Sequence, residues 1–240
     1  MLRIQNGTYS VLIWDLPTRL FHWLLVLSFS ASFIFAKLGS EFIDWHLRSG
    51  YVVLALLTFR LMWGIVGTRY ALFKSLNLNP QDIWRYGRSL VNPKVNDNLT
   101  KTYAGHNPLG SLMVVFLLSA IAMQAVSGLF MDDEIFTTGP YSGALGDSVD
   151  AVMSTIHHNL INVILVAIGF HVFAAFYYLF RKKQNLIKAM FTGRKLEEGI
   201  VQEHQIQHSK LVIALVVVIV AALFVYWLVV LNAPVIEEWY

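Results

Sequence analysis

Three histidines lie in one apolar stretch of the chain, STIHHNLINVILVAIGFHVFAAFYY, at residues 154–178. The stretch is long enough to cross a bilayer, and an imidazole is costly to bury in hydrocarbon, so ionisable groups there are candidates for a functional role. A neutral imidazole can bind a metal ion, transfer a proton or hydrogen-bond to another helix. The role of His157, His158 and His171 therefore depends on what other helices bring to the same depth.

The composition is that of an integral membrane protein. Of the 240 residues, 56% are hydrophobic and 14% are charged, whereas about a quarter of the residues in soluble domains are charged. The net charge of +3 gives no indication of a nucleic-acid partner. The chain has no cysteine, which excludes disulfides, iron–sulfur clusters and haem attached through C-x-x-C-H. The first twenty residues lack a signal-peptide pattern, and we expect none.

Five segments are apolar enough to cross a membrane, at 20–36, 46–67, 109–131, 151–180 and 211–231. Apolar runs of about 20 residues form helices in a bilayer, because only helices and closed barrels pair their backbone groups there. We therefore expect an all-α integral membrane protein, with a four-helix transmembrane bundle and a fifth, C-terminal transmembrane helix. The expected parts are a core at 1–182, a cytoplasmic linker at 183–209 and the fifth helix with its outer tail at 210–240.

Lysine and arginine fix the expected direction of the chain. Fifteen of them lie on one side of the predicted spans, in 1–19, 68–105 and 181–210. Only Lys37 and Arg48 lie on the other side. The positive-inside rule then places the N-terminus in the cytoplasm and the C-terminus in the periplasm of a bacterial inner membrane. In the cytoplasmic loop 68–105, NPQDIWRYGRSLVNP predicts a short helix on the membrane surface, starting at Asn79 and Pro80.

The histidines can now be matched by depth. His22 lies near the cytoplasmic start of the first span, and His46 near the outer end of the second. His157 lies in the outer part of the fourth span, and His171 lies fourteen residues further in, or about 21 Å along a helix. These two differ by about 40° around the helix, whereas His158 is about 140° from His171. Depth therefore pairs His46 with His157 and His22 with His171.

Two imidazole pairs at two depths of a cysteine-free bundle indicate two b-type haems. A porphyrin between helices buries its apolar faces, and each side contributes one nitrogen to the iron. Two axial ligands leave no open position for oxygen, which suits electron transfer. Gly50, Gly128 and Gly169 lie near the predicted ligands and allow close approach of the macrocycle. Arg60 is predicted to pair with haem propionates from the cytoplasmic end of the second span.

Simpler roles are open for each of these residues. A single membrane histidine is commonly an interhelical hydrogen-bonding group, and Arg60 is long enough to snorkel to the interface. His106 precedes the third span, where it is either an interfacial cap or a contact for quinone or propionate. His158 is expected to be a surface or supporting group. His204 and His208 have metal-ligand spacing, but without a third ligand nearby we expect them in a solvated segment.

Four segments together resemble a known family. They are VLIWDLPTRLFHWLLVLSF, WHLRSGYVVLALLTFRLMWGIVGTRY, GHNPLGSLMVVFLLSAIAMQAVSGLF and IHHNLINVILVAIGFHVFAAFYY. Over residues 9–182 and in this order, they resemble the bacterial cytochrome b561 family, which includes the cytochrome b subunits of membrane-bound nickel–iron hydrogenases. The resemblance implies a four-helix bundle with two b haems that exchanges electrons between the quinone pool and a redox partner. The implied iron ligands are His22, His46, His157 and His171.

One position departs from the family. Where its members often have glutamate after the histidine of the fourth helix, this chain has His158. The departure concerns which of two adjacent histidines binds iron, and the helical angle favours His157. The resemblance also leaves the fifth helix unexplained.

Three functions are compatible with the sequence. The first is a di-haem cytochrome that conducts electrons across the inner membrane between quinone or quinol and a periplasmic partner. Such a partner would be a c-type cytochrome or a dehydrogenase or hydrogenase subunit, attracted to the five acidic residues of 132–150. The second is a stand-alone oxidoreductase that passes electrons from a small reductant such as superoxide to quinone. The third, from another class, is a histidine-bearing transporter or membrane anchor.

The sequence favours the first function, as an electron-transfer subunit of a quinone-linked respiratory complex with no catalytic residue of its own. Arg60, His106 and Asn107 are candidates for the quinone site. Membrane lipids are expected partners, and an oligomer is compatible with the sequence.

Overall fold

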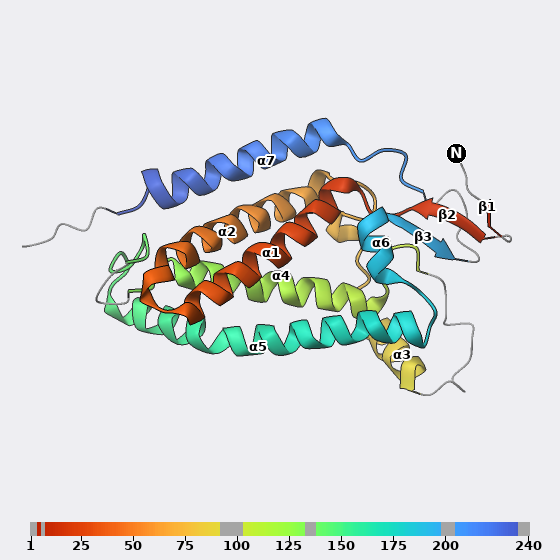
Figure 1. Ribbon diagram of the computed structural model, residues 1–240, viewed down its shortest axis with the longest axis horizontal. Helices are drawn as coiled ribbons and strands as arrows, with labels where there is room; N and C mark the ends of the chain where they lie inside the picture. Colours follow the sequence, from red (N-terminus) through yellow and green to blue (C-terminus); the bar gives the residue numbers. More distant parts are fainter. Residues whose placement is uncertain (1–3, 6–7, 92–102, 133–137, 198–204, 235–240) are drawn as a thin grey trace, which may run out of the picture. The chain divides into compact units, whose positions relative to one another are not determined.

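The computed structural model describes residues 4–5, 8–91, 103–132, 138–197 and 205–234. Five long helices dominate it: α1 Leu16–Leu38, α2 Ile43–Val66, α4 Pro108–Gly128, α5 Asp147–Phe180 and α7 Leu211–Tyr226 (Figure 1). With their short extensions, all five are long and apolar enough to cross a membrane. Each corresponds to one predicted span. The predicted fold class, an all-α multi-pass membrane bundle with a fifth helix, is confirmed.

The shorter elements connect these helices. They are the 3-10 turns η1 Ser40–Phe42 and η2 Phe73–Ser75, the helices α3 Pro80–Val91 and α6 Leu186–Thr192, and the π-helical turn η5 Trp227–Leu231. Three strands complete the described elements: β1 Ile4–Gln5, β2 Thr8–Leu12 and β3 Arg194–Glu197. The predicted linker 183–209 thus contains a helix and a strand.

The chain forms two compact units, and every long helix contributes residues to both. The sheet unit comprises Met1–Leu20, Met62–Leu117 and Ile168–Ala214. The histidine unit comprises Phe21–Leu61, Leu118–Ala167 and Leu215–Tyr240.

A three-stranded antiparallel sheet gives the sheet unit its name, and the sequence did not predict it. The strand order is β1–β2–β3, and Leu12 of β2 pairs with Arg194 of β3. Figure 1 shows β2 and β3 side by side, with α6 next to them. The strands have only two to five residues, which is too short for alternation to stand out in a sequence. The sheet joins the segment before α1 to the segment after α6.

Asp15 connects the start of α1 to the end of α2 in this unit. The carboxylate is buried and accepts hydrogen bonds from the Thr18 backbone N–H at 2.6 Å and the Trp63 indole N–H at 3.3 Å. The Thr68 hydroxyl donates to it as well. A carboxylate just before a helix caps its free N–H groups and is stabilised by the helix dipole. Because Trp63 is fully buried near the end of α2, these bonds fix the two helix ends together.

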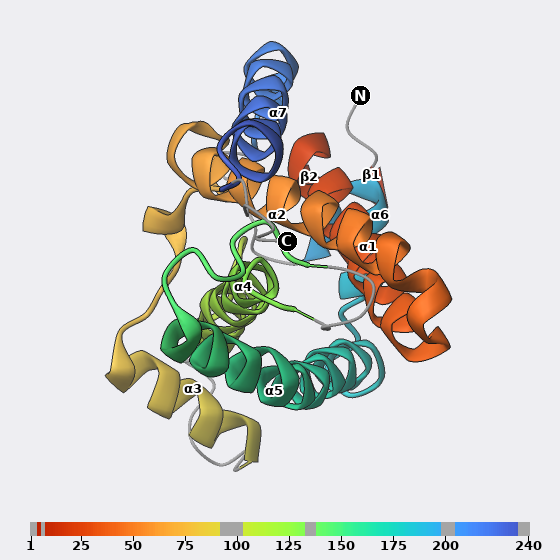
Figure 2. The same cartoon turned by 90° about the vertical axis from the view of Figure 1, so that its left-hand side faces the viewer.

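A helix, α3, is present where the sequence predicts a short helix on the membrane surface. Its start is as expected, since the Asn79 side chain accepts a hydrogen bond from the Gln81 N–H at 2.9 Å and Pro80 occupies the first helical position. The helix runs crosswise to the end of α5 (Figures 1 and 2). The crosswise course is the one expected of a helix at a membrane surface.

The fifth helix packs specifically within the histidine unit. A buried cluster joins α2, the residue after α4, and α7: it consists of Leu54, Leu129 and Val225. The Tyr141 hydroxyl donates to the Leu228 carbonyl at 2.9 Å, and the Asn232 amide donates to the Tyr141 hydroxyl at 3.1 Å. The accepting carbonyl lies in the π-helical turn. The helix α7 is therefore attached by packing and hydrogen bonds as well as by the chain.

Replacing Asp15 with alanine should destabilise the protein. The change leaves the buried indole and hydroxyl donors of Trp63 and Thr68 without their acceptor, which costs about 1–3 kcal/mol. We expect the thermal unfolding midpoint of the detergent-solubilised protein to fall by several degrees. The control is Asp44→Ala, since Asp44 is exposed in the first turn of α2. Equal midpoints for the two variants would show that Asp15 does not hold the helix ends.

Candidate functional site

His46 of α2 and His157 of α5 lie ring to ring in the histidine unit. Their ring centroids are 6.1 Å apart and their planes are at 85°. Two imidazoles that share one metal ion through bonds of about 2 Å have their ring centres about 6 Å apart. Both side chains are half-buried. The structure therefore brings together two residues that the sequence paired by depth, at a spacing that suits a shared metal.

Backbone carbonyls of two other helices hold both rings through Nδ1. The His46 Nδ1 lies 2.9 Å from the Ser32 carbonyl oxygen of α1, and the His157 Nδ1 lies 3.0 Å from the Gln124 carbonyl oxygen of α4. A carbonyl can only accept, so in each neutral ring the proton is on Nδ1 and the lone pair is on Nε2. Metal-binding histidines have this arrangement, in which the second nitrogen donates to a fixed acceptor.

Hydroxyl and amide groups reinforce both contacts. The Ser32 hydroxyl lies 3.0 Å from the His46 Nδ1. The Ser127 hydroxyl donates to the Gln124 carbonyl at 3.0 Å, beside the ring of His157. The Gln124 side-chain amide also donates to the His157 carbonyl at 2.9 Å. Residues from α1, α2, α4 and α5 thus fix the orientation of the two rings.

Two glycines make room at the pair. A Cβ at Gly128 would lie 3.0 Å from the His157 Cε1 and 3.3 Å from its Nδ1, so a larger residue there would push this ring away from α4 by a few tenths of an ångström. At Gly50, one turn after His46, no described atom lies within 4 Å of the position a Cβ would take. Two available imidazole nitrogens beside an open helix face are what a flat porphyrin requires. The residues present therefore fit a bis-histidine haem.

The other predicted ligands are distributed between the units. His22 lies in the histidine unit, where its ring meets Trp23 edge-on at 5.0 Å. Arg60 is buried in the same unit, with 4% of its surface exposed. His171 belongs to the sheet unit and is exposed. The pairing of His22 with His171 and the propionate role of Arg60 stay predictions.

The remaining histidines have local contacts. His158 is exposed, and its Nδ1 lies 2.9 Å from the carbonyl of Ser154, one turn earlier in the same helix. The ring of His106 lies against that of Trp14 in a tilted arrangement, with the centroids 4.6 Å apart and the planes at 53°. Among the described residues, no three metal-binding side chains gather. His204 lies outside the described residues, as do the acidic residues Asp133, Glu134, Glu237 and Glu238.

In the sheet unit, Asn107 begins a short polar network. Its side-chain amide donates to the Tyr178 hydroxyl at 2.9 Å, and its side-chain oxygen accepts from the Gly110 N–H at 2.8 Å. The Tyr178 hydroxyl lies 2.5 Å from that of Tyr86. Sequence reasoning singled out Asn107 but neither tyrosine, because nothing in the sequence marks them among the many aromatic residues.

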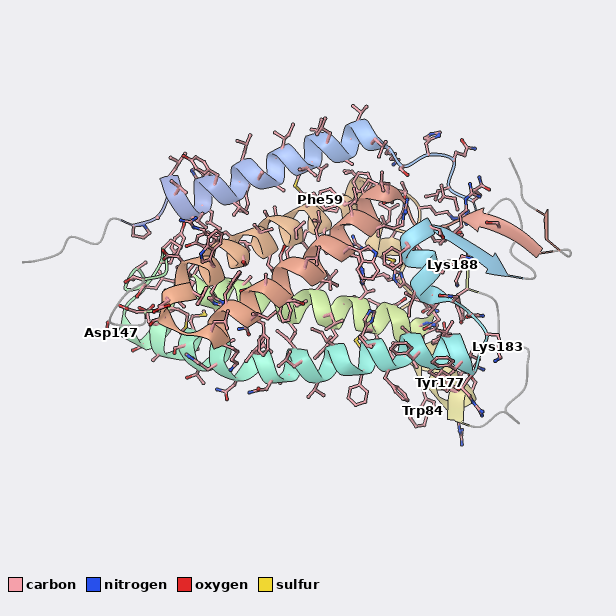
Figure 3. The ribbon with its side chains drawn as sticks, in the orientation of Figure 1. Phe59, Trp84, Asp147, Tyr177, Lys183 and Lys188 are labelled. Atoms are coloured by element: carbon pink, nitrogen blue, oxygen red, sulfur yellow. The ribbon has the colours of Figure 1, made fainter. Side chains whose placement is uncertain are left out.

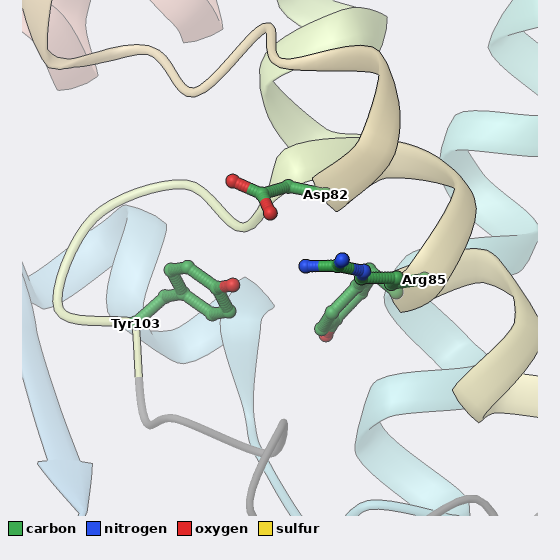
Figure 4. Close-up of a pocket in the computed structure, with 4 residues that line it drawn as sticks. Asp82, Arg85 and Tyr103 are labelled. Carbon is green, nitrogen blue, oxygen red and sulfur yellow. The ribbon is translucent and has the colours of Figure 1, made fainter.

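A small pocket adjoins this network (Figure 4). It is lined by Asp82, Arg85, Tyr86 and Tyr103 and has a volume of about 20 Å³. Burial, and then the nearby Asp82 carboxylate, raise the pKa of Tyr103 above its ordinary value. The pocket has room for one water molecule and not for a porphyrin.

Sequence reasoning missed Ser32, Gln124 and Ser127. A signal was present, since Gln124 and Ser127 are polar residues within an apolar span. Their partner could not be read from the sequence, because two of the contacts use backbone carbonyls.

A sequence model of the family described as prokaryotic cytochrome b561 matches residues 13–193. The chain belongs to this family. Its relatives include the probable Ni/Fe-hydrogenase B-type cytochrome subunit of Azotobacter chroococcum mcd 1, which is 27% identical over 228 residues, covering 81% of this chain and 91% of the relative. The subunit of the same name from Rhodobacter capsulatus is 24% identical over 221 residues, covering 78% and 81%. No solved structure matches the chain.

Membership in the cytochrome b561 family establishes the general function. The chain is a multi-pass membrane cytochrome b that takes part in electron transfer and binds b-type haem.

Replacing His157 and, separately, His158 with leucine should show which of these adjacent histidines binds the haem iron. The His157→Leu variant should lose the absorbance of one haem, because its Nε2 is lost from the pair. The His158→Leu variant should keep the wild-type haem-to-protein ratio, since among the described residues that ring hydrogen-bonds to Ser154 of its own helix. Reduced-minus-oxidised spectra and pyridine haemochromogen assays of the purified variants measure both. The opposite pattern would assign the ligand to His158.

Proposed function

We propose that this chain is a di-haem b-type cytochrome that conducts electrons across the bacterial inner membrane, between quinone or quinol and a periplasmic redox partner. The observation that supports this most is the His46–His157 pair. Its ring centroids have the separation expected of two imidazoles bound to one metal ion, and both Nδ1 protons are donated to backbone carbonyls. When bound there, haem b supplies a one-electron carrier. The protein keeps both Nε2 atoms available and holds the rings in place.

The second proposed haem uses His22 and His171. The support is the sequence relation between His171 and His157, which are fourteen residues apart on one face of α5. Arg60 is proposed to pair with a propionate. A buried guanidinium is stable only when it meets acceptors or an anion, and a carboxylate matches its fork of donors.

The proposed orientation has a cytoplasmic N-terminus and a periplasmic C-terminus. It follows from the fifteen basic residues on one side of the spans against two on the other. In this orientation the pair of His46 and His157 lies toward the periplasm.

The quinone site is proposed at the cytoplasmic side, with His106 and Asn107 as contacts. Both lie just before α4 and are half-buried. A quinone carbonyl needs hydrogen-bond donors, and its reduction consumes protons. The hydroxyls of Tyr178 and Tyr86, next to Asn107, are hydrogen-bond donors of the kind that a quinone carbonyl needs.

The periplasmic partner is proposed to be a redox protein, of the hydrogenase type or a c-type cytochrome. The relatives carry the name of Ni/Fe-hydrogenase B-type cytochrome subunits, which favours the first. Asp132 and Asp147 are exposed near the periplasmic ends of α4 and α5, and such charges favour encounter with a basic surface.

Reconstituted vesicles test the proposal. Wild-type protein should contain two haems per chain and should pass electrons from a membrane quinol to ferricyanide, which cannot cross the bilayer. The His46→Leu variant should contain one haem and should pass electrons at least tenfold more slowly, because the periplasmic pair is incomplete. The control is His208→Leu, which should match the wild type. One haem in the wild-type chain would contradict the di-haem proposal, and an unchanged rate in His46→Leu would contradict the role of the pair.

A further inference from the structure

Five cationic side chains of the sheet unit have no function in the account above. They are Arg85 and Arg88 of α3 and Arg181, Lys182 and Lys183 directly after α5. All five are exposed. Within the part of the chain that the structure describes, none of their side chains forms an ion pair or hydrogen bond. A surface with several exposed cations attracts anions, so this group favours a partner of opposite charge.

Contacts between tyrosines and α3 bring these cations together. The Tyr86 hydroxyl lies 2.5 Å from the Tyr178 hydroxyl, and the Tyr177 hydroxyl donates to the Leu90 carbonyl at 3.5 Å. Both tyrosines of α5 lie within six residues of the cations that follow this helix, and the α3 arginines flank Tyr86. The face of α3 that includes Tyr86 is therefore fixed against the end of α5. Arg88 and Arg85 are both exposed, and Arg85 also lines the pocket that contains Asp82 (Figure 4).

The depth of the cluster is set by α5. This helix is apolar enough to span a membrane and ends at Phe180. Arg181 follows it immediately, so the three cations after the helix lie where hydrocarbon gives way to headgroups. Because α3 packs on the last turns of α5, Arg85 and Arg88 are fixed near that level.

Trp84 supports the same depth. Its side chain lies on the exposed face of α3 with 71% of its surface exposed, and it projects away from the helices (Figure 3). Tryptophan with one apolar and one polar edge favours the headgroup layer. A helix that lies crosswise to a spanning helix, with tryptophan and arginine on its free side, is typical of a segment in the membrane surface.

We propose that α3 and the residues after α5 form a binding site for the phosphate of an anionic phospholipid. Arg85 and Arg88 bind the phosphate, because a guanidinium donates two parallel hydrogen bonds to it. Arg181, Lys182 and Lys183 add positive charge from the adjoining segment, and Trp84 lies beside the acyl chains. The depth and the exposed indole favour a lipid over a soluble anion or an acidic protein. The proposal does not depend on which histidines bind haem.

Native mass spectrometry of the full-length protein tests the site. The protein is purified in mild detergent and titrated with phosphatidylglycerol. The double variant Arg85→Gln with Arg88→Gln should retain at least fivefold less lipid than the wild type. The charge-matched control is Lys37→Gln with Arg48→Gln, two exposed cations of the histidine unit, and it should retain as much as the wild type. Equal retention in all three proteins would overturn the proposal.

Fluorescence of the wild-type protein provides a test that needs no arginine variant to fold. In nanodiscs, brominated phosphatidylglycerol should quench tryptophan more strongly than brominated phosphatidylcholine, and Trp84→Phe should remove most of that difference. Millimolar inorganic phosphate should leave the difference unchanged. Loss of the difference in phosphate would indicate a soluble-anion site and overturn the assignment to lipid. Loss of a co-purifying protein from the arginine variant, with lipid retention intact, would assign the surface to a protein partner instead.

Discussion

Two hydrogen bonds from imidazole N–H groups to backbone carbonyls determine what the His46–His157 pair can do. A neutral imidazole has one proton and one lone pair, and the carbonyls of Ser32 and Gln124 fix the proton on Nδ1 in both rings. The lone pairs are then on the Nε2 atoms, the atoms that we propose bind a shared iron. Because α1 and α4 supply the acceptors while α2 and α5 carry the rings, the pair requires four helices.

The rest of the fold keeps these helices in place. Asp15 fixes the start of α1 to the end of α2, and Gly128 lets the ring of His157 lie against α4. The fifth helix packs on the cluster that contains Leu54 of α2, and Tyr141 bonds to its π-helical turn. The chain belongs to the prokaryotic cytochrome b561 family, which implies that it binds b-type haem.

Sequence periodicity and charge were sufficient to predict the helices but not the contacts between them. The five spans were predicted, and the start of α3 was predicted from Asn79 and Pro80. The apolar run predicts a first span from residue 20, whereas α1 begins at Leu16 because Asp15 caps it. The sheet was missed because its strands are short and its β2–β3 pairing joins distant parts of the chain. The depth of the two residues in their spans predicted that His46 would lie next to His157. Their hydrogen-bond acceptors are backbone carbonyls, which no residue type identifies in a sequence, so the tautomers of the two rings could be assigned only from the structure.

Cryo-electron microscopy of the purified protein with its haem bound tests the central claim most directly. The account predicts a porphyrin between His46 and His157, with iron bound to both Nε2 atoms. It also predicts that each Nδ1 stays within hydrogen-bond distance of its carbonyl, that of Ser32 for His46 and that of Gln124 for His157. Iron bound through an Nδ1 atom, or a porphyrin held by other residues with His46 and His157 free of metal, would contradict it.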